Sequence, residues 1–252
     1  MAKTSDQERL KKMSRQILQR WSSYFREVYG HALPRDYLCL DCETSGLDRH
    51  RDLPLEIGHC IVRDCAVVHQ GSSVLDWTAD RNIDRRWLRG RMHETRRSMD
   101  AYDKGYRFDL DLLAAEGKNP RKVLAFYRKL FTVNREAGAF FVGQNSWFFD
   151  CELLEGCFAQ FLRKPFHFGE NEVFDCGTME KGCLLGELPY RQESLRDYFL
   201  RVRGIRAAGV RWNMAACLER HSLIEKYGLD MSQAHNAGWD AHACHLLFEE
   251  HR

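Results

Sequence analysis

The 252-residue sequence has no long apolar run, no internal repeat and no low-complexity linker. A transmembrane helix needs about 20 consecutive apolar residues, so none is predicted. The first residues are polar and include Asp6 and Glu8, which predicts neither a secretory signal nor a mitochondrial transit segment. The length allows a substantial core in one domain, with room for an added helical segment.

Common catalytic signatures are missing as well. The sequence contains neither the G-x-S-x-G elbow of serine hydrolases nor the phosphate-binding G-x-x-x-x-G-K-[ST] loop. Cys39 and Cys42 form a lone C-x-x-C, and no second pair at zinc-finger spacing accompanies it. A redox or structural zinc role for this pair is therefore not expected.

The ten cysteines are scattered through apolar segments, where a free thiol behaves as a small hydrophobic side chain. This usage predicts a reducing intracellular, cytoplasmic setting. The formal net charge is only +2, so the chain as a whole has no strong attraction for nucleic acid.

The most informative feature is a set of acidic residues that close apolar segments. Asp41 and Glu43 end the run Tyr37-Leu38-Cys39-Leu40 and lie two residues apart. Side chains alternate along a strand, so both carboxylates leave the sheet on one side and Cys42 on the other. Gly46 would then permit a tight turn. Neighbouring carboxylates raise each other's pKa, a conflict that a divalent cation removes by binding oxygen ligands.

A third carboxylate follows a second apolar strand, Ala139-Phe140-Phe141-Val142. Asn145 or Ser146 is expected to cap the next helix, with Asp150 on its buried side in the first turn. An aspartate there often serves the helix dipole alone, but an inward carboxylate needs a partner because burying a bare charge is costly.

The last acidic residue and a histidine occur in His235-Asn236-Ala237-Gly238-Trp239-Asp240. Asn236 is expected to cap the terminal helix, with Asp240 about one turn inside it. A helix rotates each residue by about 100°, so His235 must approach the same site from outside the helix. Imidazole titrates near neutrality and suits a general base, although a lone histidine there would more often be a capping or surface residue.

These segments resemble the DEDD-type 3′–5′ exonuclease family, in its DEDDh or DnaQ-like subgroup, over about residues 36–250. The resemblance implies a ribonuclease-H-like α/β fold, a mixed five-stranded sheet flanked by helices. It implies that Asp41, Glu43, Asp150 and Asp240 hold two Mg²⁺ or Mn²⁺ ions and that His235 activates water. The implied reaction cleaves phosphodiester bonds at DNA or RNA 3′ ends, single-stranded or frayed, and releases nucleoside 5′-monophosphates.

The same resemblance assigns contacts to the terminal nucleotide. They would come from the residues after the second acid and from one residue of the middle segment: Thr44, Ser45, Gly46, Leu47 and Asn145. Gln144 stands where many members have histidine, and Trp239 is bulky for its position. Met92-His93-Glu94-Thr95 is only a faint match, and no role is transferred to it. Asp175 matches no motif position.

Residues about 80–118 are expected to be an irregular, arginine-rich insertion. Arg85, Arg86 and Arg89 are predicted to track the phosphate backbone, against the alternative of a solvated helix face or loop. Other segments predict a strand hairpin over 55–75, a helix from Asn119-Pro120, a strand at 172–176 and helices over 193–202 and 212–227.

Residues 1–33 form an amphipathic pattern outside the family resemblance and predict a helical extension to the exonuclease domain, 34–252. Packing on the domain is favoured, with a homodimer or a protein partner as the alternative. This helix leaves a second function open, a nucleic-acid-binding or polymerase-associated module that acts mainly through a partner. Trp147 and Phe148 are predicted to lie in the core, although either could stack on a base.

Overall fold

The computed structural model describes Ser23, Arg26 and residues 33–100 and 105–252. The strands are β1 (Tyr37–Thr44), β2 (Pro54–Arg63), β3 (Ala66–Val74), β4 (Phe140–Gly143) and β5 (Val173–Asp175). The α-helices are α2 (Arg85–Asp100), α3 (Leu110–Glu116), α4 (Pro120–Glu136), α5 (Asp150–Cys157), α6 (Cys176–Leu185), α7 (Leu195–Gly204), α8 (Met214–Arg220), α9 (Leu223–Tyr227) and α10 (Ala237–His251). Shorter turns are η1 (Trp77–Ala79), η2 (Ser146–Phe148), η3 (Phe158–Leu162) and η4 (Met231–Gln233). The predicted extension over 1–33 lies almost wholly outside the described residues, so its helix and its partner stay predictions.

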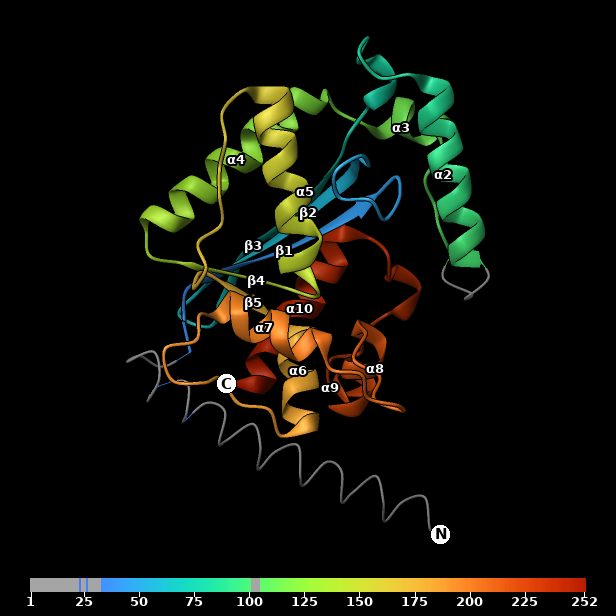
Figure 1. Cartoon of the computed structure of the whole chain (residues 1–252). Helices are drawn as coiled ribbons and strands as arrows, with labels where there is room; N and C mark the ends of the chain where they lie inside the picture. Colours follow the sequence, from blue (N-terminus) through green and yellow to red (C-terminus); the bar gives the residue numbers. More distant parts are fainter. Residues whose placement is uncertain (1–22, 24–25, 27–32, 101–104) are drawn as a thin grey trace.

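The five strands form one mixed sheet in the order β3-β2-β1-β4-β5, which confirms the predicted α/β architecture. β1 pairs antiparallel with β2 and parallel with β4, and β4 pairs parallel with β5. In Figure 1, α4 and α5 lie above the sheet, and α6, α7 and α10 lie below it. Parallel strands bring their carboxyl ends to one edge, so the ends of β1 and β4 open toward the same place. Asp41 and Glu43 lie near the carboxyl end of β1, and Asp150 follows soon after the carboxyl end of β4.

The central strand is buried because helices cover both of its faces. Its first four residues, from Tyr37 to Leu40, are fully buried, which is typical of a strand with no solvent face. The predicted hairpin is confirmed as β2 and β3, and the predicted strand near Glu172 is β5. Asn119 caps α4 by accepting from the Lys122 N–H, as expected from Asn-Pro.

The expectation of an irregular segment over 80–118 is wrong, because most of it is helical. The Asp84 carboxylate accepts the backbone N–H of Arg86 at 2.7 Å, at the first turn of α2. Leu88 and Met92, four residues apart, bury the inner face of this helix. The arginines occupy other positions of α2, and their number obscured this apolar stripe in the sequence.

Two smaller expectations about helix boundaries also fail. Asn145 and Ser146 do not cap α5, because Asn145 adopts a left-handed backbone with φ 61° and α5 starts after Phe149. The helix expected over 212–227 is two helices, α8 and α9. Ser222 separates them with a left-handed φ of 56°. None of the described helices is long and apolar enough to cross a membrane.

Candidate active site at the end of the central strand

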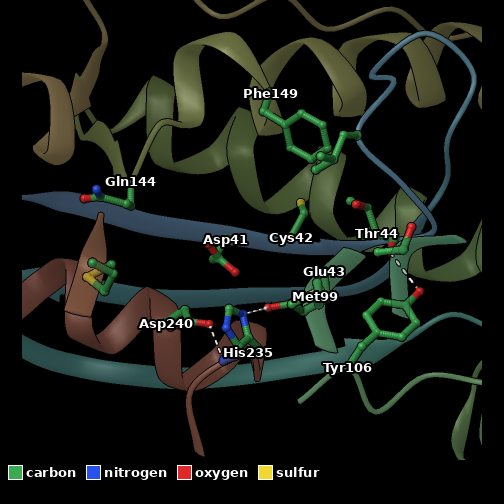
Figure 2. Close-up of a pocket in the computed structure, with 13 residues that line it drawn as sticks. Asp41, Cys42, Glu43, Thr44, Met99, Tyr106, Gln144, Phe149, His235 and Asp240 are labelled. Atoms are coloured by element: carbon green, nitrogen blue, oxygen red, sulfur yellow. Dashed lines mark hydrogen bonds and ion pairs between the residues drawn. The ribbon is translucent and has the colours of Figure 1, made fainter. Parts of the chain in front are cut away.

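A cavity of about 240 Å³ opens at the carboxyl end of β1. Figure 2 shows its lining, which comes from β1 and the loop after it, α2 and the loop after it, the β4–α5 connection, the first residue of α8 and the start of α10. Four of the five predicted catalytic residues line it: Asp41, Glu43, His235 and Asp240. Strand pairing and helix docking thus bring together residues almost 200 positions apart.

Asp41 and Glu43 project from the same side of β1, toward the start of α10, as strand alternation predicts (Figure 2). Cys42 projects to the other side, toward Phe149. Cys39 and Cys42 are three residues apart on one strand, and all ten cysteines are free thiols. Strand alternation places the side chains of Cys39 and Cys42 on opposite faces of β1.

The start of α10 rests directly against β2. An added Cβ on Gly58 would lie 2.0 Å from the Ala237 carbonyl oxygen, so only glycine allows this approach. The Ala237 N–H also donates to the buried Glu56 carboxylate at 3.1 Å. Asn236 caps the helix as predicted, because its side chain accepts from two backbone N–H groups of the first turn. These contacts fix where Asp240 enters the cavity.

His235 approaches the cavity from outside α10, as the five-residue offset required. Its backbone is left-handed, with φ 68°, and its N–H donates to Asp240 Oδ2 at 2.9 Å. The ring Nδ1 lies 3.7 Å from Glu43 Oε1. Such a backbone costs a non-glycine residue about 1–3 kcal/mol and persists only when its surroundings impose it. The hydrogen bond to Asp240 provides that constraint and holds the imidazole beside Glu43.

The carboxylates raise one another's pKa. Burial and the neighbouring Asp240, Asp150 and Glu43 charges hold the pKa of Asp41 well above its usual range. Burial, then the charge of Glu43, raises the pKa of Asp240 to about 7, against an opposing effect of His235. Within the described residues, none of these acids forms an ion pair with lysine or arginine. The site therefore gathers carboxyl oxygens that would bind a hard divalent cation in place of their protons.

Asp150, the fifth predicted residue, is buried beside the cavity without lining it. Burial and then the Glu43 charge raise its pKa well above the ordinary value. It lies in the first turn of α5 on the inner side, as expected from the sequence. Its carboxylate thus belongs electrostatically to the same cluster.

The four residues that follow Glu43 differ in whether they line the cavity. Thr44 and Leu47 line the cavity, and Leu47 is 80% exposed. Ser45 and Gly46 are buried and do not line it. The chain bends at Gly46, but its backbone is not left-handed, so the bend does not require a glycine for its φ. A Cβ there would lie 2.4 Å from Asp52 Oδ2, which shows that the glycine makes room for a side chain.

The middle segment presents Gln144 rather than Asn145 to the cavity. Gln144 Nε2 donates to the Trp212 carbonyl at 2.7 Å, while the Asn145 N–H donates to Asp175 Oδ1 at 3.1 Å. Asp175 itself caps α6 and is fully buried, so its role here is structural. The predicted contact between Asn145 and a nucleotide stays a prediction.

The three arginines assigned to the substrate lie at the start of α2. Arg85, Arg86 and Arg89 are exposed and do not line the cavity. Arg85 Nε donates to the Thr78 carbonyl at 2.9 Å. The cavity is lined instead by Thr95 and Met99, nearer the other end of the helix.

Several lining residues were not expected from the sequence. Thr95 Oγ1 donates to the Ser45 carbonyl at 2.8 Å, and Tyr106 Oη donates to the Thr44 carbonyl at 3.0 Å. Phe149, the third aromatic of its run, also lines the cavity, whereas Trp147 and Phe148 are core residues. The faint match around Thr95 was the one available signal for this wall.

No family model and no curated protein matches the chain. Solved structures do match: E. coli Exonuclease I in complex with a dA16 oligonucleotide, at TM-score 0.55 and 19% identity, over 85% of this chain and 40% of that one. A zinc-bound form of the E. coli ExoI–ssDNA complex matches at TM-score 0.54 and 18% identity, over 86% and 40%. The chain thus spans about two fifths of the length of these structures. The likeness confirms the predicted ribonuclease-H-like fold, a mixed sheet flanked by helices that exonuclease structures also have.

Proposed function

We propose that this chain is a metal-dependent 3′–5′ exonuclease that acts on single-stranded or frayed ends of DNA or RNA and releases nucleoside 5′-monophosphates. The observation that carries the proposal is a cavity lined by three carboxylates and one histidine, with a fourth carboxylate buried beside it. The order of these residues along the chain resembles the DEDDh subgroup. The fold shared with Exonuclease I structures, some of which hold single-stranded oligonucleotides, supports the same proposal.

Asp41, Glu43, Asp150 and Asp240 would hold two Mg²⁺ or Mn²⁺ ions. The fit rests on the placement of these acids, since Asp41, Glu43 and Asp240 line one cavity and Asp150 is buried beside it. Burial and the neighbouring carboxylates raise the pKa values of Asp41, Asp150 and Asp240, as expected where no metal ion is bound. Bound divalent ions at such a site supply Lewis-acid polarisation of the phosphate, a more acidic water and charge compensation for the leaving oxygen. An excess of carboxylate oxygens favours these hard cations.

His235 would take the proton from the attacking water. Its side chain is one third exposed at the cavity, and its backbone N–H is tied to Asp240, so the ring reaches solvent from a fixed position. Neutral imidazole accepts a proton readily near neutral pH. Thr44, Leu47 and Phe149 would contact the terminal sugar and base, because they line the same cavity beside the acids.

Oligonucleotides labelled at the 5′ end test the proposal directly. Incubation of DNA and RNA oligomers with the purified chain and Mg²⁺ or Mn²⁺ should give a ladder that shortens from the 3′ end. Chelation by EDTA should stop it, and nucleoside 5′-monophosphates should be the products. Internal cuts, a ladder from the 5′ end or full activity in EDTA would each contradict the assignment. Comparing DNA with RNA also shows which sugar the site accepts.

We also propose a cytoplasmic, reducing setting for this enzyme, since all ten cysteines are free thiols and nine are buried. A disulfide found by mass spectrometry in unreduced protein isolated from its host would contradict that setting.

A further inference from the structure

A second group of carboxylate and imidazole side chains lies away from the candidate active site. Glu180 on α6, His221 just after α8 and His251 at the end of α10 bring their ligand atoms within 4.8 Å of one another. Glu180 and His251 are 1% and 2% exposed. α6, α8 and α10, which hold these residues or end beside them, lie below the sheet (Figure 1).

The two imidazoles converge on one carboxylate oxygen. His221 Nε2 lies 3.1 Å from Glu180 Oε2, and His251 Nε2 lies 3.3 Å from the same atom. The other oxygen, Oε1, accepts from Arg220 Nη1 at 2.5 Å. Arg220 therefore leaves Oε2 to the two histidines.

The hydrogen bonds of this group are incomplete. Both ring nitrogens of His251 are buried without a hydrogen-bond partner, although Nε2 is directed at Glu180 within ion-pair distance. A buried imidazole with neither nitrogen hydrogen-bonded is costly, since its polar groups have lost water without replacement. This is the signature of a ligand position whose partner is something other than a protein atom.

We propose that Glu180, His221 and His251 form a structural site for a zinc-class transition metal ion, separate from the candidate active site. A tetrahedral Zn²⁺ with ligands at about 2.0–2.2 Å separates its ligand atoms by about 3.3–3.5 Å. The two separations from Glu180 Oε2, 3.1 and 3.3 Å, lie just below and at that spacing, and all three ligand atoms lie within 4.8 Å of one another. Two imidazoles and one carboxylate favour zinc over Mg²⁺, which prefers oxygen alone. Water would complete the coordination.

One further observation supports the site. The ligands are 41 and 30 residues apart along the sequence, so one ion would connect α6, the α8 end and the α10 end. An ion in that position would stabilise the support on which the last helix rests.

Zinc content and thermal stability test this site without reference to nuclease activity. The background is the full chain carrying Asp41→Asn and Asp240→Asn, which removes two of the four carboxylates of the candidate active site. In it, His221→Gln and His251→Gln are compared with His167→Gln. The control residue is an exposed histidine whose Nδ1 lies 3.3 Å from Glu155.

The background and the His167→Gln control should retain about one equivalent of zinc after desalting, measured by plasma mass spectrometry. Both cluster variants should retain less than about a tenth of that. Zinc at a hundredfold excess over Kd should raise the Tm of the background protein by about 5–10 °C.

Cobalt(II) substitution provides a readout that does not depend on variants that fold. The wild-type chain loaded with cobalt(II) should show the intense visible absorption of a tetrahedral ion, and added zinc should displace the cobalt. An absence of bound zinc together with an unchanged Tm would overturn the site and leave a metal-free core cluster. Retention of zinc in both cluster variants would place the ion elsewhere and overturn it equally.

Discussion

The two ends of α10 lie against the same kinds of side chain in opposite electrostatic settings. At its start, Asp240 joins Asp41 and Glu43 in a cavity, and burial beside like charges raises the pKa of Asp240 to about 7. At its end, Glu180 contacts Arg220 and two imidazoles, and these partners lower the pKa of Glu180 to about 2 despite burial. The comparison separates two uses of a buried carboxylate. Acids without a cationic partner need a bound ion, whereas Glu180 is already compensated by Arg220 and two imidazoles before any ion binds.

The largest expected contrast comes from neutralising one carboxylate at each end. Asp41→Asn should reduce exonuclease activity to the detection limit, because a metal-binding oxygen is removed. In EDTA the same change should raise the free energy of unfolding by about 1–2 kcal/mol, since it relieves repulsion. Glu180→Gln should lower it by about 3–5 kcal/mol, because Arg220 and two histidines lose a buried partner. Urea unfolding in EDTA measures the free energy of unfolding of both variants. Changes of the same sign would contradict the proposed contrast between the two ends of α10.

The histidine at the cavity should matter for turnover rather than for stability. His235→Ala is expected to lower kcat about 10²–10⁴-fold, the usual cost of removing a general base. Its Tm should change little, because the ring is partly exposed and the Asp240 bond uses the backbone. His242→Ala is the matched control on α10, where the ring contacts Gln70 Oε1 at 2.8 Å outside the cavity. Equal reductions of kcat in both variants would remove His235 from the chemistry.

The close approach of Gly58 to the backbone of Ala237 predicts the next largest effect, on both stability and activity. Gly58→Ala should lower the free energy of unfolding by about 1–3 kcal/mol and reduce activity, because the added methyl group displaces the Ala237 backbone. Gly71→Ala on β3 is the control, since its Cβ would meet the His59 ring at an ordinary 3.4 Å. An unchanged kcat in Gly58→Ala would show that Asp240 tolerates movement of the helix.

The two ends should also respond to pH in opposite directions. A carboxyl whose pKa is raised by folding binds its proton more tightly in the native state. Asp240 thus contributes stability at low pH. That contribution is lost as the pH rises from about 4, the ordinary pKa of an aspartate, to about 7, the pKa of Asp240 in the folded protein. Glu180 has a lowered pKa, so its stability is lost as pH falls from about 4.5 to about 2. Tm measured across both windows in EDTA should lose the first slope in Asp240→Asn and the second in Glu180→Gln. Mn²⁺ should also flatten the first slope.

The residues of the candidate active site could be located from the sequence because each has a local pattern that topology then brings together. Strand alternation placed Asp41 and Glu43 on one side, and the offset of His235 from Asp240 required a position outside the helix. The wall formed by Thr95 and Tyr106 had no such pattern, since it depends on how α2 and the following loop pack against the β1 loop.

The cluster at the other end of α10 was equally hidden from the sequence. His251 has no sequence signal beyond its place near the end of a helix. Its burial and its approach to Glu180 arise only from the packing of α6 and α10. Local periodicity thus determines which side of an element a residue occupies, while convergence of distant elements needs the three-dimensional structure.

The smallest expected effect concerns substrate affinity through the exposed side of α2. If Arg85, Arg86 and Arg89 bind the phosphate backbone, their joint replacement by alanine should weaken oligonucleotide binding and flatten its salt dependence. The slope of log K against log[salt] should fall by about 0.7 for each phosphate of a single strand that the protein no longer neutralises. Lys122→Ala with Lys129→Ala, on exposed positions of α4, controls for the removal of charge alone. Because these arginines do not line the cavity, kcat at saturating substrate should stay unchanged. Fluorescence anisotropy at several salt concentrations measures the slope, and identical slopes in the arginine and lysine variants would show that this side of α2 serves only as a solvated helix face.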